Sequence, residues 1–153
     1  MDATALLAED HDHVRERFSD LDDLGPSEAA ERRALLGDLR QELEVLARVE
    51  EEVFYPAVRR LPDENANDLV EEALERHDEV KLLADDLARV DPADPDFEER
   101  LAELRESVEM HVTQEESEIF PIARERLGIA RLDELGKELE AMRETLMGAQ
   151  VAR

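Results

Sequence analysis

The stretch that decides how this chain is organised is His111-Val112-Thr113-Gln114-Glu115-Glu116-Ser117-Glu118-Ile119-Phe120-Pro121. It places an imidazole and a carboxylate four residues apart, at His111 and Glu115. On an α-helix, side chains at this spacing lie one above the other on the same face, about 6 Å apart. Such a pair can bind one metal ion, or bind one ion and bridge to a second.

Apolar residues recur at helical spacing along five segments, which predicts five helices. The predicted helices span approximately Asp2–Leu24, Glu28–Arg60, Glu64–Val90, Pro95–Leu127 and Arg131–Met147. Short connections between four long helices predict an all-α fold, an antiparallel up-down-up-down four-helix bundle over residues 1–128. Residues 129–153 are predicted to add an amphipathic C-terminal helix, packed on the bundle or at a dimer interface, and a frayed tail.

The composition fits a helical protein and excludes several classes of function. Among 153 residues, 42% are hydrophobic, 41% are charged and only 3% are aromatic. A formal net charge of −24 disfavours nucleic acid and anionic membranes as partners. The absence of cysteine excludes disulfides and thiolate ligands. Neither a signal peptide nor a long apolar run is recognisable, so we expect a cytoplasmic monomer or homodimer.

Polar residues interrupt the apolar stripes at the middle of the predicted helices. They are His11, Glu50, His77, His111, Glu115 and Glu118. A single histidine on such a face is more often a hydrogen-bonded core residue than a ligand. Here three histidines and several carboxylates share core faces that carry no lysine or arginine, and buried carboxylates need a counter-charge. A metal ion is the economical counter-charge, and imidazole plus carboxylate without sulfur suits iron, manganese or zinc.

The chain contains an internal repeat. A shift of 65 residues aligns the segment Val49–Pro56 with Gln114–Pro121, so that Glu50 matches Glu115, and a shift of 66 aligns His11 with His77. This predicts two related helical hairpins packed about a pseudo-two-fold axis. Leu46 occupies the position equivalent to His111, so one half of the predicted site lacks a histidine that the other half has.

In the order of its motifs, the sequence resembles the hemerythrin-like (HHE cation-binding) domain family over roughly residues 5 to 127. The motifs are Leu6-Leu7-x-x-Asp10-His11-x-x-Val14-Arg15, Glu50-Glu51-Glu52-Val53-Phe54-Tyr55-Pro56, His77-x-x-Val80-Lys81 and His111-x-x-x-Glu115-Glu116-x-x-x-Phe120-Pro121. The resemblance implies two iron ions in an oxo- or hydroxo-bridged non-heme centre. His11 would bind one iron, His77 and His111 the other, and Glu50 and Glu115 would bridge.

Leu46 stands where the family pattern has histidine, which leaves three candidates for the missing ligand. Glu118 lies one turn beyond Glu115, Tyr55 follows the motif of Glu50 beside a proline, and water would leave the position open. The rotation of Tyr55, about 140° from Glu50 on a regular helix, opposes its participation unless the proline re-aims it.

The family resemblance implies chemistry with O2, hydrogen peroxide or nitric oxide. Loss of a histidine and gain of oxygen donors favours catalase-like disproportionation of hydrogen peroxide. The alternatives are a non-catalytic protein that binds, senses or stores O2, NO or iron, and a metal-free helical interaction module.

Overall fold

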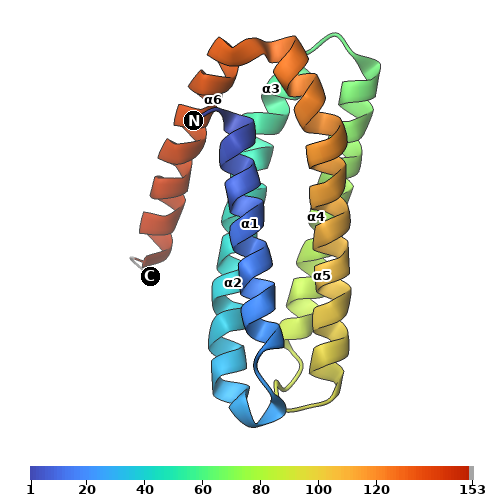
Figure 1. Ribbon diagram of the computed structural model, residues 1–153, viewed down its shortest axis with the longest axis vertical. Coiled ribbons are helices and arrows are strands. Elements are labelled where there is room, and N and C mark those ends of the chain that lie inside the picture. Colours follow the sequence, from blue (N-terminus) through green and yellow to red (C-terminus); the bar gives the residue numbers. More distant parts are fainter. Residues whose placement is uncertain (152–153) are drawn as a thin grey trace.

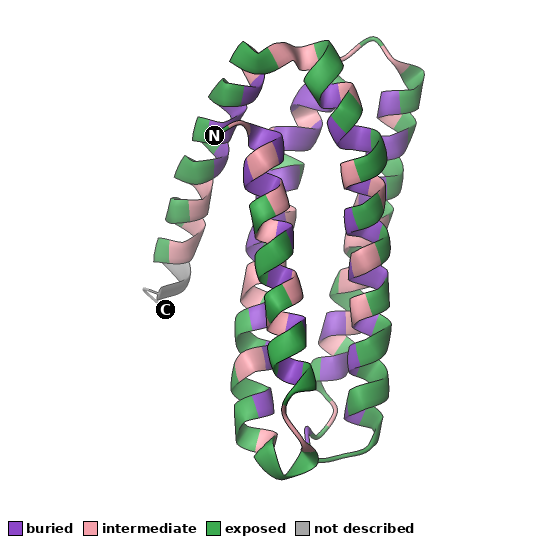
Figure 2. Cartoon of the chain, in the orientation of Figure 1, coloured by how far each residue is buried: buried purple, intermediate pink, exposed green. Residues whose placement is uncertain are grey.

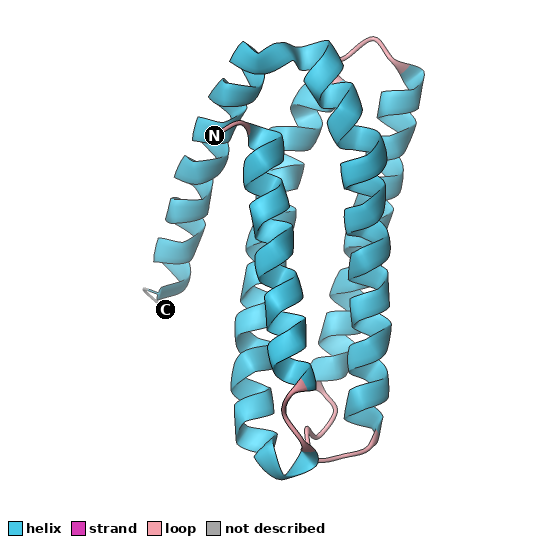
Figure 3. Cartoon of the chain, viewed as in Figure 1, coloured by secondary structure: helices cyan, strands magenta, loops and turns pink. Residues whose placement is uncertain are grey.

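A computed structural model describes residues 1–151 and shows four long antiparallel helical segments with a fifth segment along one side (Figure 1). The described residues contain helices and loops and no strand (Figure 3). The helices are α1 (Ala3–Asp22), α2 (Ala29–Val49), α3 (Tyr55–Arg59), α4 (Glu64–Ala88), α5 (Asp96–Gln114) and α6 (Phe120–Val151). The predicted all-α four-helix bundle is confirmed. None of the described helices is both long and apolar enough to cross a membrane.

Two π-turns join helices that would otherwise form single long helices. The turn η2 (Glu50–Phe54) joins α2 to α3, and the turn η3 (Glu115–Ile119) joins α5 to α6. Each precedes a proline, Pro56 or Pro121. Because proline has no N–H and its ring collides with the carbonyl four residues earlier, a regular helix is disfavoured there. A turn with i→i+5 hydrogen bonding accommodates the proline without ending the helix.

The core of the bundle consists of the inward faces of the helices (Figure 2). Its largest fully buried side chains are aromatic: Phe18, Phe54, Tyr55, Phe97 and Phe120. Such side chains each remove about 150–250 Å² from water and dominate core energetics. Phe54, Tyr55 and Phe120 all belong to the π-turns or the residues that follow them, so the two turns lie in the packed interior.

Arg32 ties together two loops at one end of the bundle. Its side chain is buried and donates hydrogen bonds to the carbonyls of Leu24 and Pro92, both at 2.8 Å, and to Glu98 at 2.9 Å. Its guanidinium also lies 5.0 Å from the ring centroid of Phe97. A buried cation is tolerated when its donors are satisfied in this way.

The chain turns back at Gly128, where the predicted fourth helix ends. Gly128 has φ 82° and ψ 165°, a conformation that side chains with a Cβ rarely adopt. Beyond this kink Leu132, Leu135 and Leu139 are buried against the bundle, and Arg143 forms an ion pair with Asp10 of α1. In this single chain the C-terminal segment therefore packs on the bundle.

Gly136 allows the C-terminal segment to approach the N-terminus closely. A Cβ at this position would collide with the backbone carbonyl oxygen of Met1, whereas a Cβ at the exposed Gly37 of α2 would meet nothing within 4 Å. We expect Gly136→Ala to lower the free energy of unfolding by about 1–3 kcal/mol, as overpacking does. Gly37→Ala should raise it by about 0.5–1 kcal/mol, because alanine is the better helix former. Urea unfolding of both variants checks this, and equal effects would contradict the observed close approach.

Candidate metal centre

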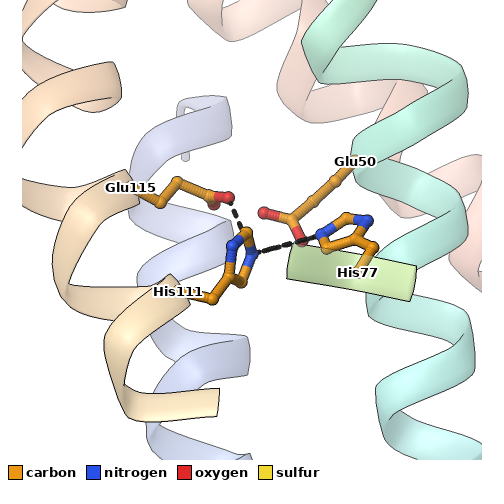
Figure 4. A group of neighbouring side chains, drawn as sticks. All are labelled: Glu50, His77, His111 and Glu115. Carbon is orange, nitrogen blue, oxygen red and sulfur yellow. Dashed lines mark hydrogen bonds and ion pairs between the residues drawn. The ribbon is translucent and has the colours of Figure 1, made fainter. Parts of the chain in front are cut away.

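Four potential metal ligands converge at the middle of the bundle. They are Glu50 of η2, His77 of α4, His111 of α5 and Glu115 of η3 (Figure 4). Each of the four offers one ligand atom, and these atoms lie within 4.8 Å of one another. All four were predicted from the sequence, and the structure brings them together from different elements.

The donor atoms of this group point at a common space. The Nε2 atoms of His77 and His111 lie 3.1 Å apart. Oε1 of Glu50 lies 3.2 Å from Nε2 of His77, and Oε2 of Glu115 lies 3.2 Å from Nε2 of His111. Both carboxylates are 0% exposed. Two carboxylate oxygens and two imidazole nitrogens therefore share one small, dry volume.

His11 joins the group through Glu115. Its ring is 0% exposed, and its Nε2 lies 3.5 Å from Oε1 of Glu115. Oε2 of the same carboxylate faces His111, so Glu115 presents one oxygen to each side. This is the arrangement that a bridging carboxylate requires. His13, two residues further along α1, is exposed and takes no part in the group.

Several buried polar atoms of this cluster have no hydrogen-bond partner. They are Nε2 of His11, both carboxylate oxygens of Glu50 and Oε1 of Glu115. Buried polar atoms in proteins are almost always hydrogen-bonded, and an unpartnered buried acceptor destabilises the fold. Unpartnered polar atoms that come together from three elements, here α1, η2 and η3, are typical of a cation-binding site. The donor set thus fits a metal ion, and imidazole with carboxylate suits iron, manganese or zinc.

The histidines and the carboxylates shift one another's protonation. Burial by itself would lower the histidine pKa values, but nearby carboxylates more than offset it. Glu115 and Glu50 raise the pKa of His11 to about 9 and that of His111 to about 10, and Glu50 and Glu51 raise the pKa of His77 to about 9. Burial opposes the charge on Glu115, yet Glu50 and the surrounding histidines hold the pKa of this carboxyl well below its usual range. Without a metal, protons on the histidines supply the positive charge that the carboxylates need.

Tyr55 points into the centre although a regular helix would turn it away. Its hydroxyl donates to Oε2 of Glu115 at 2.5 Å and lies 3.3 Å from Nε2 of His77. The π-turn explains this, because the backbone N–H of Tyr55 bonds to the carbonyl of Glu50, five residues earlier, and the extra residue brings both side chains to one face. Burial, together with Glu115 and Glu50, raises the pKa of Tyr55 well above its usual value, so it is a neutral phenol here.

Glu118, the other candidate for the missing ligand, lies outside the group. The structure places its side chain on the exposed surface, in a shallow depression with residues such as Arg76 and Glu106. The sequence prediction assumed a regular helix after Glu115. The π-turn η3 begins at Glu115 and adds a residue to the turn, which rotates Glu118 away from the centre.

Two carboxylates that the sequence analysis did not select hold the outer nitrogens of two histidines. His77 donates through Nδ1 to Glu51 at 2.8 Å, and His11 donates through Nδ1 to Glu116 at 2.6 Å. These contacts aim Nε2 of each ring inward, a common arrangement for metal-bound histidines. Glu51 and Glu116 are equivalent under the 65-residue repeat. That equivalence, and their position directly after Glu50 and Glu115, is the signal that could have identified them.

The two halves of the centre share a scaffold but differ in their donors. The ring of Tyr55 lies beside His77 with centroids 5.5 Å apart, and the ring of Phe120 stacks on His11 at 6.0 Å. Tyr55 and Phe120 are equivalent in the repeat, so the phenol of Tyr55 in one half corresponds to the phenyl ring of Phe120 in the other. Leu46 is buried in the apolar core, where the other half has His111.

Comparisons with known proteins point to one family. A family model described as the Hemerythrin HHE cation binding domain matches residues 2–123. The crystal structure of a Hemerythrin HHE cation binding domain-containing protein, an Rv2633c homolog from Mycobacterium kansasii, is similar with a TM-score of 0.88 and 25% sequence identity. The match covers 99% of this chain and 91% of that one. A DNA nickase from Nostoc sp. strain PCC 7120 is 28% identical over 141 residues, which is 92% of this chain but only 39% of that protein.

The outer carboxylates should contribute to metal affinity. We expect Glu51→Gln and Glu116→Gln each to weaken ferrous-iron binding by about 10- to 100-fold, because an amide accepts the histidine hydrogen bond less strongly than a carboxylate and changes to such outer partners have effects of this size. Competition against a coloured chelator under anaerobic conditions measures the affinity. Glu118→Gln is the matched control in the same segment and should leave affinity unchanged. A loss of affinity in Glu118→Gln would instead indicate that Glu118 is a metal ligand.

Without metal, stability should depend on pH through the same histidines. Their folded-state pKa values lie above the unfolded value of 6.5, so their stabilising contribution is complete below pH 6.5 and is lost as pH rises through about 9 to about 10. Urea unfolding of the metal-free protein across this range should show decreasing stability. His77→Asn should reduce the slope, and His13→Asn, at an exposed position, should not. A flat profile would contradict the ion pairing of the metal-free centre.

Proposed function

Since the chain belongs to the hemerythrin HHE cation-binding family, we propose that it holds two iron ions and disproportionates hydrogen peroxide. The single observation that carries this proposal is the set of buried, unpartnered nitrogen and oxygen atoms at the centre of the bundle. The donors are distributed over two adjoining positions, which suits a pair of ions in a carboxylate-rich bundle core.

The first iron would be held by His77 and His111 together with one oxygen each of Glu50 and Glu115. The ligand atoms of these four residues already lie within 4.8 Å of one another. The second would be held by His11 together with Glu115 and Glu50. With Leu46 in place of a histidine, the second position would have fewer protein donors, which leaves coordination sites for a small exogenous ligand.

Tyr55 is the residue that we propose as an additional ligand or hydrogen-bond donor at the first position. Its hydroxyl oxygen already lies within hydrogen-bond distance of Glu115 and His77. A phenolate favours ferric over ferrous iron, which suits peroxide chemistry better than reversible O2 carriage. Tyr55→Phe removes only the hydroxyl, so a visible phenolate-to-iron band that disappears in this variant would identify it as a ligand.

Bound iron would supply the redox change and polarise peroxide oxygen. The residues of the chain contribute the rest. Glu115 and Glu50 supply the negative charge that would bind the metal ions. Glu51 and Glu116 orient the rings of His77 and His11. The buried rings of Phe54 and Phe120 surround the centre with apolar side chains. The net charge of −24 disfavours nucleic acid, so the activity named for the Nostoc relative does not enter the proposal.

The proposal predicts two irons per chain and evolution of one O2 for every two H2O2 consumed. His11→Asn should lose about half of the iron and most of the turnover, because His11 is the histidine donor of the second position. His13→Asn is the matched control, two residues away and exposed. Metal analysis and an oxygen electrode measure both quantities, with zinc-loaded protein as the control for redox chemistry.

The other outcomes decide between the remaining possibilities. Iron binding with spectral changes on adding O2 or NO, but without peroxide consumption, would favour a non-catalytic binding, sensing or storage protein. A stably folded protein that takes up no iron would overturn the proposal.

A further inference from the structure

A groove with a volume of about 640 Å³ runs between α2 and α4. Its walls include Ala47 and Arg48 of α2 and Lys81 and Ala84 of α4. Figure 1 shows α2 beside α1 and α4 beside α5, so a groove lined by α2 and α4 lies between the two hairpins. The groove is far larger than a molecule of peroxide or a diatomic gas.

The inner end of the groove reaches the centre. Glu51 and His77 both line it, and they are joined by the 2.8 Å hydrogen bond from Nδ1 of His77. The other nitrogen of the same ring, Nε2, lies 3.1 Å from His111 and 3.2 Å from Glu50. A single imidazole ring therefore separates the groove from the ligand cluster. The side chain of His77 is 8% exposed and that of His11 is 0% exposed, so His77 lies nearer the solvent than His11.

The lining of the groove is close to charge balance, unlike the protein as a whole. Its basic residues are Arg40, Arg48 and Lys81, and its acidic residues are Glu44, Glu51, Asp78 and Asp85. The formal charge of this lining is −1, from three positive and four negative side chains, against −24 for the chain. Such an opening does not select for ions, and it suits a small uncharged molecule.

The side of the bundle that faces Leu46 is covered. A smaller cavity of about 160 Å³ lies between α1, α2 and the C-terminal segment, and its lining includes Leu46, Arg143 and Met147. The ion pair of Arg143 with Asp10 holds that segment down. The C-terminal segment thus forms one wall of this smaller cavity.

We propose that the groove between α2 and α4 is the route by which small uncharged molecules reach the metal centre, passing the Glu51–His77 pair at its inner end. The inference rests on the proposed function, because it requires iron at the centre. Lys81 lies one helical turn from His77, and Ala47 lies one turn from Glu51. A larger side chain at either position would therefore narrow the inner end of the groove.

The lack of cysteine in the chain permits a test on the folded protein. A single cysteine is introduced by Lys81→Cys, the protein is loaded with ferrous iron, and a bulky maleimide is attached afterwards. Thr113→Cys, at an exposed position of α5, is the matched control. The measurement is the association rate of nitric oxide by stopped-flow absorbance, with metal analysis before and after labelling.

Labelling of Lys81→Cys should slow nitric oxide association at least about tenfold, an added barrier of ~1.4 kcal/mol. Labelling of Thr113→Cys should not change the rate, and the final extent of binding should be the same in both proteins. Ala47→Trp should reproduce the slowing without a label. Unchanged rates in labelled Lys81→Cys and in Ala47→Trp, with iron retained, would overturn the route alone. Failure of every form to hold iron would overturn the proposed function and the route with it.

Discussion

The constraint on which this bundle depends is the burial of two carboxylates, Glu50 and Glu115, whose ion pairs in the described part of the chain are with histidines and not with lysine or arginine. An unpaired buried carboxylate costs several kcal/mol, and this centre contains two that are 0% exposed. Positive charge must therefore be supplied at the centre, by protons on the histidines or by metal. The surrounding elements serve this requirement: aromatic rings exclude water, and outer carboxylates orient the histidine rings.

The internal repeat supplies a nearly symmetrical frame for an unsymmetrical site. Both hairpins contribute a π-turn, an inward carboxylate and an outer carboxylate that holds a histidine. Only one hairpin contributes a histidine on the helix before its π-turn, because Leu46 replaces it in the other. Tyr55 comes from the hairpin that lacks this histidine, and its hydroxyl reaches across to His77 and Glu115 of the other hairpin. The two iron positions that we propose would therefore have different numbers of donors within the same backbone arrangement.

Much of this arrangement could be predicted from the sequence because it depends on periodicity. Residues at intervals of three and four define a helical face, and a polar residue on such a face must be buried whatever the neighbouring helices are. This reasoning predicted the four long segments, the end of the fourth at Gly128 and the core positions of His11, Glu50 and His111. The 65-residue repeat predicted that Glu50 and Glu115 would be equivalent, and the structure places both in the group.

The rest could not be predicted because it depends on departures from that periodicity. A rotation of 100° per residue directs Tyr55 away from Glu50 and leaves Glu118 near the centre. The π-turns reverse both expectations, and the prolines that follow them indicated only that the helix would be disturbed. Glu51 and Glu116 were missed for another reason. They lie at the edge of the apolar faces, and their role depends on the ring orientation of a histidine on another helix.

The π-turns make the centre sensitive to the number of residues in two short segments as well as to their identity. Each turn contains one residue more than a regular helical turn. That extra residue determines the direction in which the following side chains point around the helix axis. Deleting one residue within Glu50–Phe54 would remove the extra residue of the turn and rotate the side chains that follow it relative to Glu50. It would also rotate the phenol away from Glu115. A one-residue deletion in either segment would therefore alter the centre itself, even though every candidate ligand is retained.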